Sequence, residues 1–229
     1  MSTAAFISDI HSNLEALEAV LADVRTEEVY CLGDLVGYGA SPNEVIDLVR
    51  ERNVHALMGN HDYAATTGDT GRFNARAGMA AMWTRSQLTE ENLGYLRSLP
   101  MQRKTSVGGT SLHMTHGSPD DPLWEYVDPR THSQVFGHYI GKLEVKALAL
   151  GHTHVPYSWI EKSGVVFNPG SVGQPRDGDW RASFAMVEFS QGEIAVEVQR
   201  VEYDVEGAIA KIAHVGLPEE LGSRLRVGR

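Results

Sequence analysis

Three consecutive polar side chains, Asn60-His61-Asp62, follow the apolar run Val54 to Met58 and the single residue Gly59. Asn60 carries a neutral amide oxygen, His61 carries an imidazole that titrates near neutral pH, and Asp62 carries a carboxylate that can orient this imidazole. An apolar run that ends in this way stops contributing to the core and begins to form a site. The stretch therefore predicts a functional site at the end of a strand.

Four other apolar runs end in residues of the same kinds. Their endings are Asp9-Ile10-His11, Gly33-Asp34, His116-Gly117 and Gly151-His152-Thr153-His154. Functional residues of parallel α/β proteins lie at the carboxyl ends of strands, so we expect the five endings to meet at one place. Carboxylate, amide and imidazole donors without thiolate suit manganese, iron, cobalt, nickel or zinc better than magnesium.

Strands and helices alternate in the first part of the chain. Strands are predicted over residues 3–8, 29–32 and 54–58, and capping-box patterns predict helix starts at Ser12-Asn13-Leu14-Glu15 and Ser41-Pro42-Asn43-Glu44. Alternation of this kind is typical of a parallel α/β fold.

Residues 64–99 have a helical pattern, with an expected helix cap at Thr89. This helical insertion either covers core or shapes the site, and the sequence favours neither. The later elements are predicted strands at 103–107, 110–115, 157–160, 164–167, 183–189 and 193–201, a helix at 129–142, a buried strand that runs into His152, and a helix at 204–213. The Gly- and Arg-containing tail is a candidate for mobility.

Composition limits the class of protein. The 229 residues are 42% hydrophobic and 22% charged, which suits one globular domain over residues 1–229 with the insertion inside it. No apolar run approaches a membrane span, and the single cysteine, Cys31, agrees with a reducing compartment, so we expect a cytoplasmic protein without membrane attachment. The net charge of −10 argues against binding to long double-stranded nucleic acid.

The five motifs resemble, in content and order, those of the calcineurin-like metallophosphoesterase superfamily. The family pattern is Asp-x-His, Gly-Asp, Gly-Asn-His-Asp/Glu, His and Gly-His-x-His, and Asn168-Pro-Gly-Ser171-Val-Gly173 is similar to the small prokaryotic phosphodiesterase branch. The resemblance implies a four-layered α-β-β-α sandwich with two mixed sheets.

The resemblance also implies roles for the motif residues. Two divalent transition-metal ions are expected, manganese first among them, with a bridging hydroxide that attacks the phosphorus atom. The implied ligands are Asp9, His11 and His154 for the first ion, Asn60, His116 and His152 for the second, and Asp34 as the bridge. In the family, the histidine at the position of His61 faces the leaving group and can protonate it.

One departure from the relatives bears on the substrate. Met58 stands where the Ser/Thr protein phosphatases of this superfamily carry arginine, which favours a small phosphodiester over a dianionic monoester. Arg176 is a candidate phosphate contact or a solvated turn residue, and Trp124 and Tyr126 either stack on an organic group or pack locally. The rival functions are a nucleotide or protein phosphomonoesterase and a non-catalytic metal-binding scaffold; the presence of His61 counts against the scaffold. The sequence does not indicate the oligomeric state.

Overall fold

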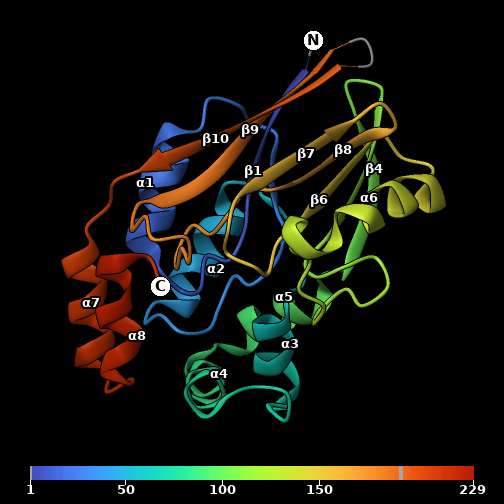
Figure 1. The fold of residues 1–229 in the computed structure, drawn as a ribbon. Coiled ribbons are helices and arrows are strands. Elements are labelled where there is room, and N and C mark those ends of the chain that lie inside the picture. Colours follow the sequence, from blue (N-terminus) through green and yellow to red (C-terminus); the bar gives the residue numbers. More distant parts are fainter. Residues whose placement is uncertain (1, 191–192) are drawn as a thin grey trace.

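Two five-stranded sheets face each other in the computed structural model, which describes residues 2–190 and 193–229 (Figure 1). The first sheet has the order β10-β9-β1-β2-β3. Its strands are β1 (Ser2–Ile7), β2 (Val29–Cys31), β3 (His55–Ala56), β9 (Ala182–Ser190) and β10 (Glu193–Val201). Strands β1, β2 and β3 are parallel, and β9 returns antiparallel beside β1.

The second sheet has the order β4-β5-β6-β8-β7. Its strands are β4 (Gln102–Val107), β5 (Thr110–Thr115), β6 (Ala147–Leu150), β7 (Tyr157–Glu161) and β8 (Gly164–Asn168). The central strands β5, β6 and β8 are parallel, and both edge strands are antiparallel to their neighbours. The expected pair of mixed sheets is confirmed.

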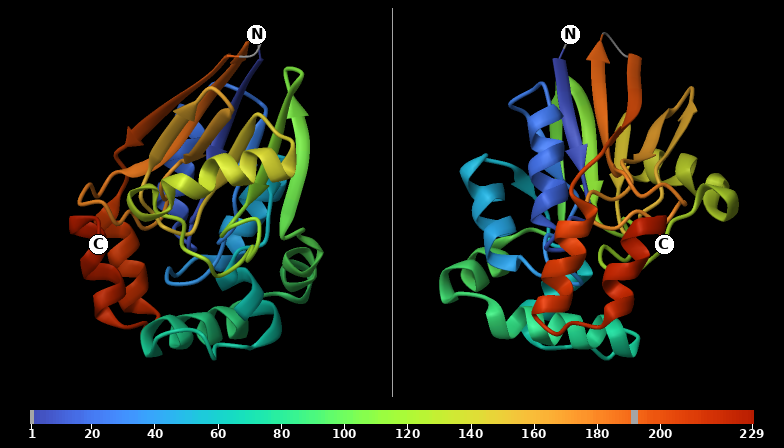
Figure 2. Two further views of the ribbon diagram at one scale, coloured as in Figure 1. Left: turned by 45° about the vertical axis from the view of Figure 1, so that its right-hand side comes forward. Right: turned by 90° about the vertical axis from the view of Figure 1, so that its left-hand side faces the viewer.

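Helices cover the outer faces of the two sheets. Helices α1 (Leu14–Asp23) and α2 (Pro42–Glu51) lie outside the first sheet, and α6 (Pro129–Leu143) lies outside the second (Figure 2). This arrangement confirms the four-layered sandwich. Within the described residues, no helix combines the length and the apolar character that a membrane crossing requires.

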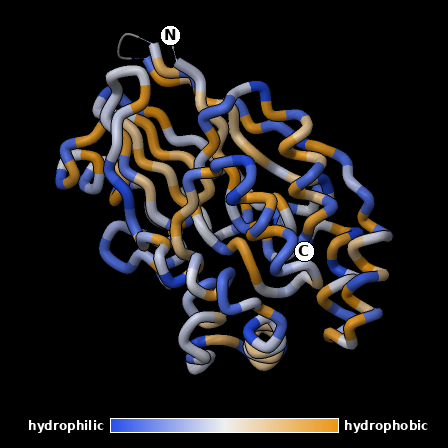
Figure 3. The backbone as a smooth tube through the Cα atoms, turned by 180° about the vertical axis from the view of Figure 1, so that it is seen from behind, coloured by the Kyte–Doolittle hydropathy of each residue, from blue (hydrophilic) through white to orange (hydrophobic). Residues whose placement is uncertain are grey.

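Aromatic packing joins the two sheets. Phe6 of β1 is fully buried, and its ring meets the edge of Phe167 from β8, with 4.9 Å between the ring centroids. On its other side the Phe6 ring stacks on Tyr30 of β2 at 5.3 Å. In Figure 3 hydrophobic colours run through the strands between the helices. This core holds the carboxyl ends of β1, β2, β5 and β6 in one place.

The predicted third strand is shorter than residues 54–58. Only His55 and Ala56 form β3, because the backbone N–H of Met58 leaves the sheet and donates to the carbonyl of Pro100. The chain then enters helix α3 (Asn60–Thr67) directly after Gly59. The insertion is thus three helices, α3, α4 (Ala75–Gln87) and α5 (Glu90–Ser98), and it begins four residues earlier than expected.

Helix caps follow the sequence only in part. Thr89 caps α5 as predicted, since its side chain accepts from the N–H of Asn92. The predicted cap of α1 is wrong by one residue: Asn13, and not Ser12, accepts from the N–H of Ala16. At α2, Ser41 occupies the N-cap position, but its side chain makes no capping hydrogen bond within the described residues.

The C-terminal segment is folded, so its predicted mobility is wrong. It forms α7 (Val205–His214), α8 (Glu219–Ser223) and the 3₁₀ helix η1 (Arg224–Val227). Leu221 and Leu225 are buried in a cluster that also contains Tyr38 and two alanines of α4, Ala77 and Ala80. The N–H of Gly178 donates to the carbonyl of Gly228. Apolar packing therefore holds this end beside the insertion.

Candidate metal centre and its cavity

The five predicted strand ends meet at one edge of the sandwich. Most of their polar side chains sit on loop residues with left-handed backbone conformation, which is uncommon for residues other than glycine and clusters at functional sites. These residues are Asp9, His11, Asp34, His152 and His154, with φ angles of 53°, 50°, 56°, 66° and 59°. The loop conformation turns alternate side chains toward a common centre, as the motif spacing predicted.

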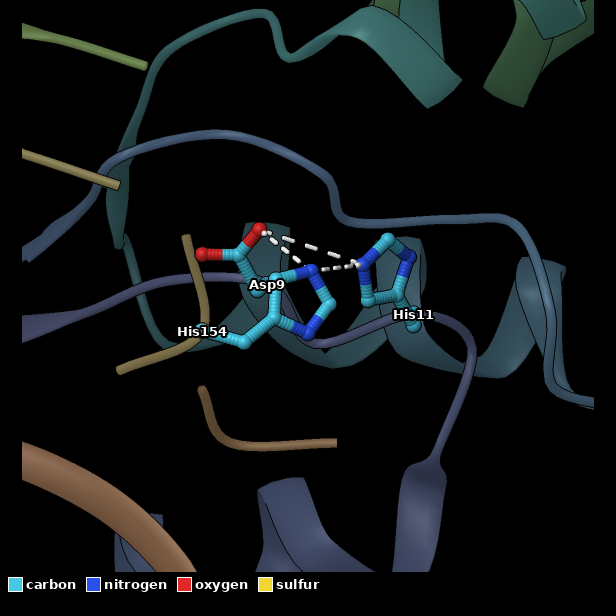
Figure 4. A group of neighbouring side chains, drawn as sticks. All are labelled: Asp9, His11 and His154. Carbon is cyan, nitrogen blue, oxygen red and sulfur yellow. Dashed lines mark hydrogen bonds and ion pairs between the residues drawn. The ribbon is translucent and has the colours of Figure 1, made fainter. Parts of the chain in front are cut away.

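Asp9, His11 and His154 form the first group of donors (Figure 4). The Nε2 atoms of His11 and His154 are 3.1 Å apart, and Asp9 Oδ1 is 3.2 Å from His154 Nε2 and 3.8 Å from His11 Nε2. All three side chains are buried. Three donor atoms this close together can hold one cation.

Asp34, His116 and His152 form a second group, with Asn60 beside it. His116 Nε2 is 3.1 Å from both Asn60 Oδ1 and His152 Nδ1. Asp34 Oδ2 is 3.4 Å from His116 Nε2 and 3.6 Å from His11 Nε2 of the first group. The Asp34 carboxylate therefore lies between the two groups.

Backbone carbonyls orient the four imidazoles of these groups. The outward ring nitrogen of each imidazole faces one carbonyl oxygen: His11 Nδ1 faces Val36, His154 Nδ1 faces Gln174, His116 Nδ1 faces Leu32 and His152 Nε2 faces Trp124. If each outward nitrogen donates its proton there, the inward nitrogens carry lone pairs that face one another at 3.1 Å. Such lone pairs repel unless a proton or cation lies near, so the donor set fits divalent transition-metal ions.

Burial and mutual charge shift the titration of these groups. Burial and then the charge of His116 lower the pKa of His152 to about 3. Burial alone would raise the pKa of Asp34, but the neighbouring His116 and His61 outweigh it and hold that pKa well below its usual range. Burial lowers the pKa of His116, but the Asp34 carboxylate outweighs it and raises the pKa to about 9. A proton on His116 and a metal ion bound to it compete for the same imidazole.

His61 differs from the other histidines of the site. Its ring packs against Tyr38, Phe73 and His11, with centroid distances of 4.3, 4.6 and 4.9 Å, and its Nδ1 has no hydrogen-bond partner among the described residues. One of its ring nitrogens also lies within 4.8 Å of donor atoms of His11 and Asp34. Burial, and then the charge of Arg176, lower the pKa of His61 to about 4.

Asp62 does not orient His61, so that expectation is wrong. Its carboxylate accepts from the backbone N–H groups of Gly59 and Val36. Both bonds stabilise the start of α3 and the loop after β2, because Asp62 is the third residue of the helix. Burial, and then the charge of Asp34, raise the pKa of Asp62 to about 7.

A cavity of about 250 Å³ opens over the two groups. Its walls carry His61, four aromatic rings and two arginines: Tyr38, Phe73, Trp124, Tyr126, Arg72 and Arg176. Trp124, Tyr126 and Arg176, the candidate substrate contacts, thus line this cavity. The sequence motifs did not indicate Arg72, Phe73 or Tyr38, although Tyr38 lies in the Gly-rich loop Gly37-Tyr38-Gly39 that follows Asp34.

The insertion contributes to the cavity directly. Phe73, in the loop between α3 and α4, packs against both His61 and Trp124, at 4.6 and 5.2 Å. The guanidinium of Arg72 lies 5.1 Å from the centre of the Trp124 ring, and Tyr126 stacks on His152 at 3.9 Å. Local packing and exposure to the cavity are therefore both true of Trp124 and Tyr126.

Residues 3–192 match the family model described as the calcineurin-like phosphoesterase superfamily domain. The chain belongs to this superfamily. Over 248 aligned positions it is 40% identical to an uncharacterized protein of Methanocaldococcus jannaschii, covering 100% of this chain and 99% of that one.

Solved structures agree with the assignment. A metallophosphoesterase from Sphaerobacter thermophilus is 36% identical and superposes with a TM-score of 0.82, covering 99% of this chain and 100% of that one. A hypothetical protein from Pyrococcus horikoshii is 25% identical, with a TM-score of 0.91 and coverage of 100% and 99%. Superfamily membership and the two His/Asp groups together support a metal-binding phosphoric ester hydrolase.

Proposed function

We propose that this calcineurin-like protein hydrolyses a small phosphodiester with the help of two divalent transition-metal ions. The observation that carries the proposal is the presence, around one cavity, of the two donor groups, the imidazole of His61 and the guanidinium of Arg176. The donor groups suit metal ions, the imidazole suits proton transfer, and the guanidinium suits a phosphate oxygen.

The proposed ligands follow the two groups. Asp9, His11 and His154 hold the first ion, and Asn60, His116 and His152 hold the second, with Asp34 shared between them. When bound, the ions polarise the phosphoryl oxygens and lower the pKa of a coordinated water so that it attacks phosphorus. Manganese is our first choice of metal, and the donor types equally accept iron, zinc, cobalt or nickel.

His61 is the proposed proton donor to the leaving group. In the free protein its ring is neutral near pH 7, because its pKa is lowered to about 4. A phosphate anion bound between His61 and Arg176 favours the protonated ring, since a nearby negative charge stabilises the imidazolium. The leaving group then lies on the His61 side of the cavity, against Phe73 and Trp124.

The balance of cations supports a diester. Arg176 lines the cavity, and in residues 2–190 and 193–229 no carboxylate forms an ion pair with it, so its charge is available to a substrate. The side chain of Arg72 is 61% exposed and lies 3.6 Å from Asp121, so it stands at the rim and is partly compensated. Arg176 donates one hydrogen bond to Gln174 Oε1, and one guanidinium whose charge is not offset by a carboxylate among these residues matches a monoanionic diester. Trp124 and Tyr126 offer ring faces to an organic substituent of the ester.

A phosphomonoesterase is the second candidate, and Arg72 is the observation that favours it. If Arg72 left Asp121 and turned into the cavity, two guanidiniums would face the phosphate, as a dianion requires.

The two candidates differ in their preferred ester. We expect kcat/KM for bis(p-nitrophenyl) phosphate to exceed that for p-nitrophenyl phosphate when metal-stripped protein is reconstituted with the same ion. A monoester preference of about tenfold or more, equal to about 1.4 kcal/mol of transition-state binding, contradicts the diester proposal.

The role of His61 has its own test. Replacing His61 with Gln is expected to leave both ions bound and to lower turnover of an alkyl ester by roughly 10²- to 10⁴-fold, the usual contribution of a general acid. The loss is expected to be much smaller for a nitrophenyl ester, because nitrophenolate needs little protonation. Equal losses for both esters contradict acid catalysis, and loss of metal places His61 among the ligands.

A further inference from the structure

Arg224 is a partly buried arginine outside residues 3–192, the range that the family model matches. It begins η1, the last helical turn of the chain, and its Nε and Nη2 atoms are buried without a hydrogen-bond partner among the described residues. Burial, the largest influence, lowers the pKa of Arg224 to about 10. Burying guanidinium N–H groups without hydrogen-bond partners costs free energy, so other contacts must stabilise this side chain.

The guanidinium of Arg224 lies on the ring of Tyr38. Its central carbon is 4.5 Å from the ring centroid, a distance at which the negative face of the ring attracts the cation. Leu221 and Leu225, on either side of Arg224 in the chain, are buried in the same cluster as Tyr38. The C-terminal segment therefore packs around Tyr38 with apolar side chains and places a guanidinium against its ring.

The ring of Tyr38 also contacts His61. The Tyr38 ring is 4.3 Å from the ring of His61 and 4.7 Å from that of His11. Tyr38 has a left-handed φ of 58°. The preceding Gly37 has a φ of 94°, and a Cβ atom at this position would lie 2.4 Å from His61 Nδ1, so glycine leaves the space that the His61 ring occupies. The loop is thus shaped so that Tyr38 and His61 pack together.

The imidazole of His61 depends on such packing for its orientation. Each of the four other imidazoles of the centre faces a backbone carbonyl, whereas His61 Nδ1 has no hydrogen-bond partner in the described part of the chain. Its ring is instead held between Tyr38, Phe73 and His11. Tyr38 is therefore one of the three rings whose packing determines the direction in which the His61 ring points.

We propose that Arg224 is a positioning residue, whose guanidinium holds the Tyr38 ring against His61 and so sets the direction of proton transfer to the leaving group. The inference rests on the proposed role of His61 as the proton donor. It assigns to the C-terminal segment, which lies beyond residues 3–192 of the family match, a part in the chemistry of the site.

The test compares Arg224→Gln with Arg226→Gln in the full, metal-loaded protein. Arg226 lies on the same helical turn but is half exposed and pairs with Glu206 at 2.7 Å, so its loss is a matched control. We expect Arg224→Gln to lower kcat for an alkyl diester by roughly tenfold to 100-fold, with metal content and KM unchanged, because misplacement of a reacting group has effects of this size. The nitrophenyl diester is expected to lose less than about threefold, and Arg226→Gln to change neither.

A double-mutant cycle with Tyr38→Leu shows whether Arg224 acts through the ring. If it does, adding Arg224→Gln to Tyr38→Leu causes little further loss with the alkyl diester. Additive losses overturn the inference, as do equal losses for the two esters, because a purely structural role would affect both alike. Should Arg224→Gln fail to fold, Arg224→Lys, which keeps a cation but not the planar guanidinium, is measured in the same way and is expected to show a smaller loss with the same ester dependence.

His61→Gln, measured in parallel, distinguishes failure of the inference about Arg224 from failure of the proposed function. If His61→Gln discriminates between the two esters and neither Arg224 variant does, the inference about Arg224 is overturned and the proposed function stands. If His61→Gln itself shows equal losses, the proposed acid fails and the inference fails with it.

Discussion

Replacement of Asp34 with Asn tests the centre most directly. The Asp34 carboxylate is buried, its Oδ1 accepts from the N–H of His61, and its Oδ2 faces His116 and His11 at 3.4 and 3.6 Å. Asparagine keeps the shape and one oxygen but removes the negative charge. At about 4 Å and an effective dielectric constant of about 20, one pair of unit charges interacts by about 4 kcal/mol. We therefore expect each ion to bind at least roughly 10²- to 10³-fold more weakly.

The assay is metal content and affinity, measured by elemental analysis after dialysis and by competition with a chelator. Asp62→Asn is the matched control, because Asp62 is equally buried and only two helical positions from Asn60, but its carboxylate accepts from the N–H groups of Gly59 and Val36. Asparagine keeps only one of these two acceptor oxygens, so the start of α3 loses one hydrogen bond, but no oxygen that faces the two donor groups is changed and metal binding is expected to survive in this variant. Two ions bound to Asp34→Asn with wild-type resistance to the chelator would refute a bridging role for Asp34.

Two further substitutions test the frame around the site. Replacing Phe6 with Ala is expected to lower the free energy of unfolding by about 3–5 kcal/mol, because the ring is fully buried between the sheets. In urea denaturation, the midpoint concentration should fall while the slope of unfolding free energy against urea stays unchanged. A loss below about 1 kcal/mol would contradict this packing. Replacing Gly59 with Ala places a Cβ atom 2.1 Å from Asp34 Oδ1, so we expect metal affinity to drop at least about tenfold. If chelator competition is the same as for the wild type, the backbone at position 59 shifts without displacing Asp34, and this expectation is wrong.

Much of the fold was predictable because it depends on local pattern. Apolar runs of strand length and the cap at Thr89 each act over a few residues, and the structure confirms them. The errors also have local causes. Asn13 competes with Ser12 for the N-cap of α1. Asn60, His61 and Asp62, which the sequence places at the end of a strand, form the first turn of α3, because the Asp62 side chain accepts from the N–H of Gly59 and stabilises the start of this helix.

The sequence by itself determined which residues could do chemistry and that they would meet. Five apolar runs ending in Asp, Asn and His residues are enough for that, since parallel strands end at the same edge of a sheet. The family pattern then assigned each of these residues a role, and the structure brings their side chains within a few ångströms of one another.

Only the tertiary structure decided what surrounds that centre. The carbonyls that orient the imidazoles, Arg72 and Phe73 from the insertion, and the contact of Arg224 with Tyr38 all join residues far apart in the chain. Neither the hydrophobic periodicity nor the motif spacing of the sequence indicates such pairs, because each pair depends on how whole helices and strands pack. The residues that could bind metal can therefore be identified from the sequence, whereas those that shape the cavity and orient His61 follow from the packing of the insertion and the C-terminal helices around it.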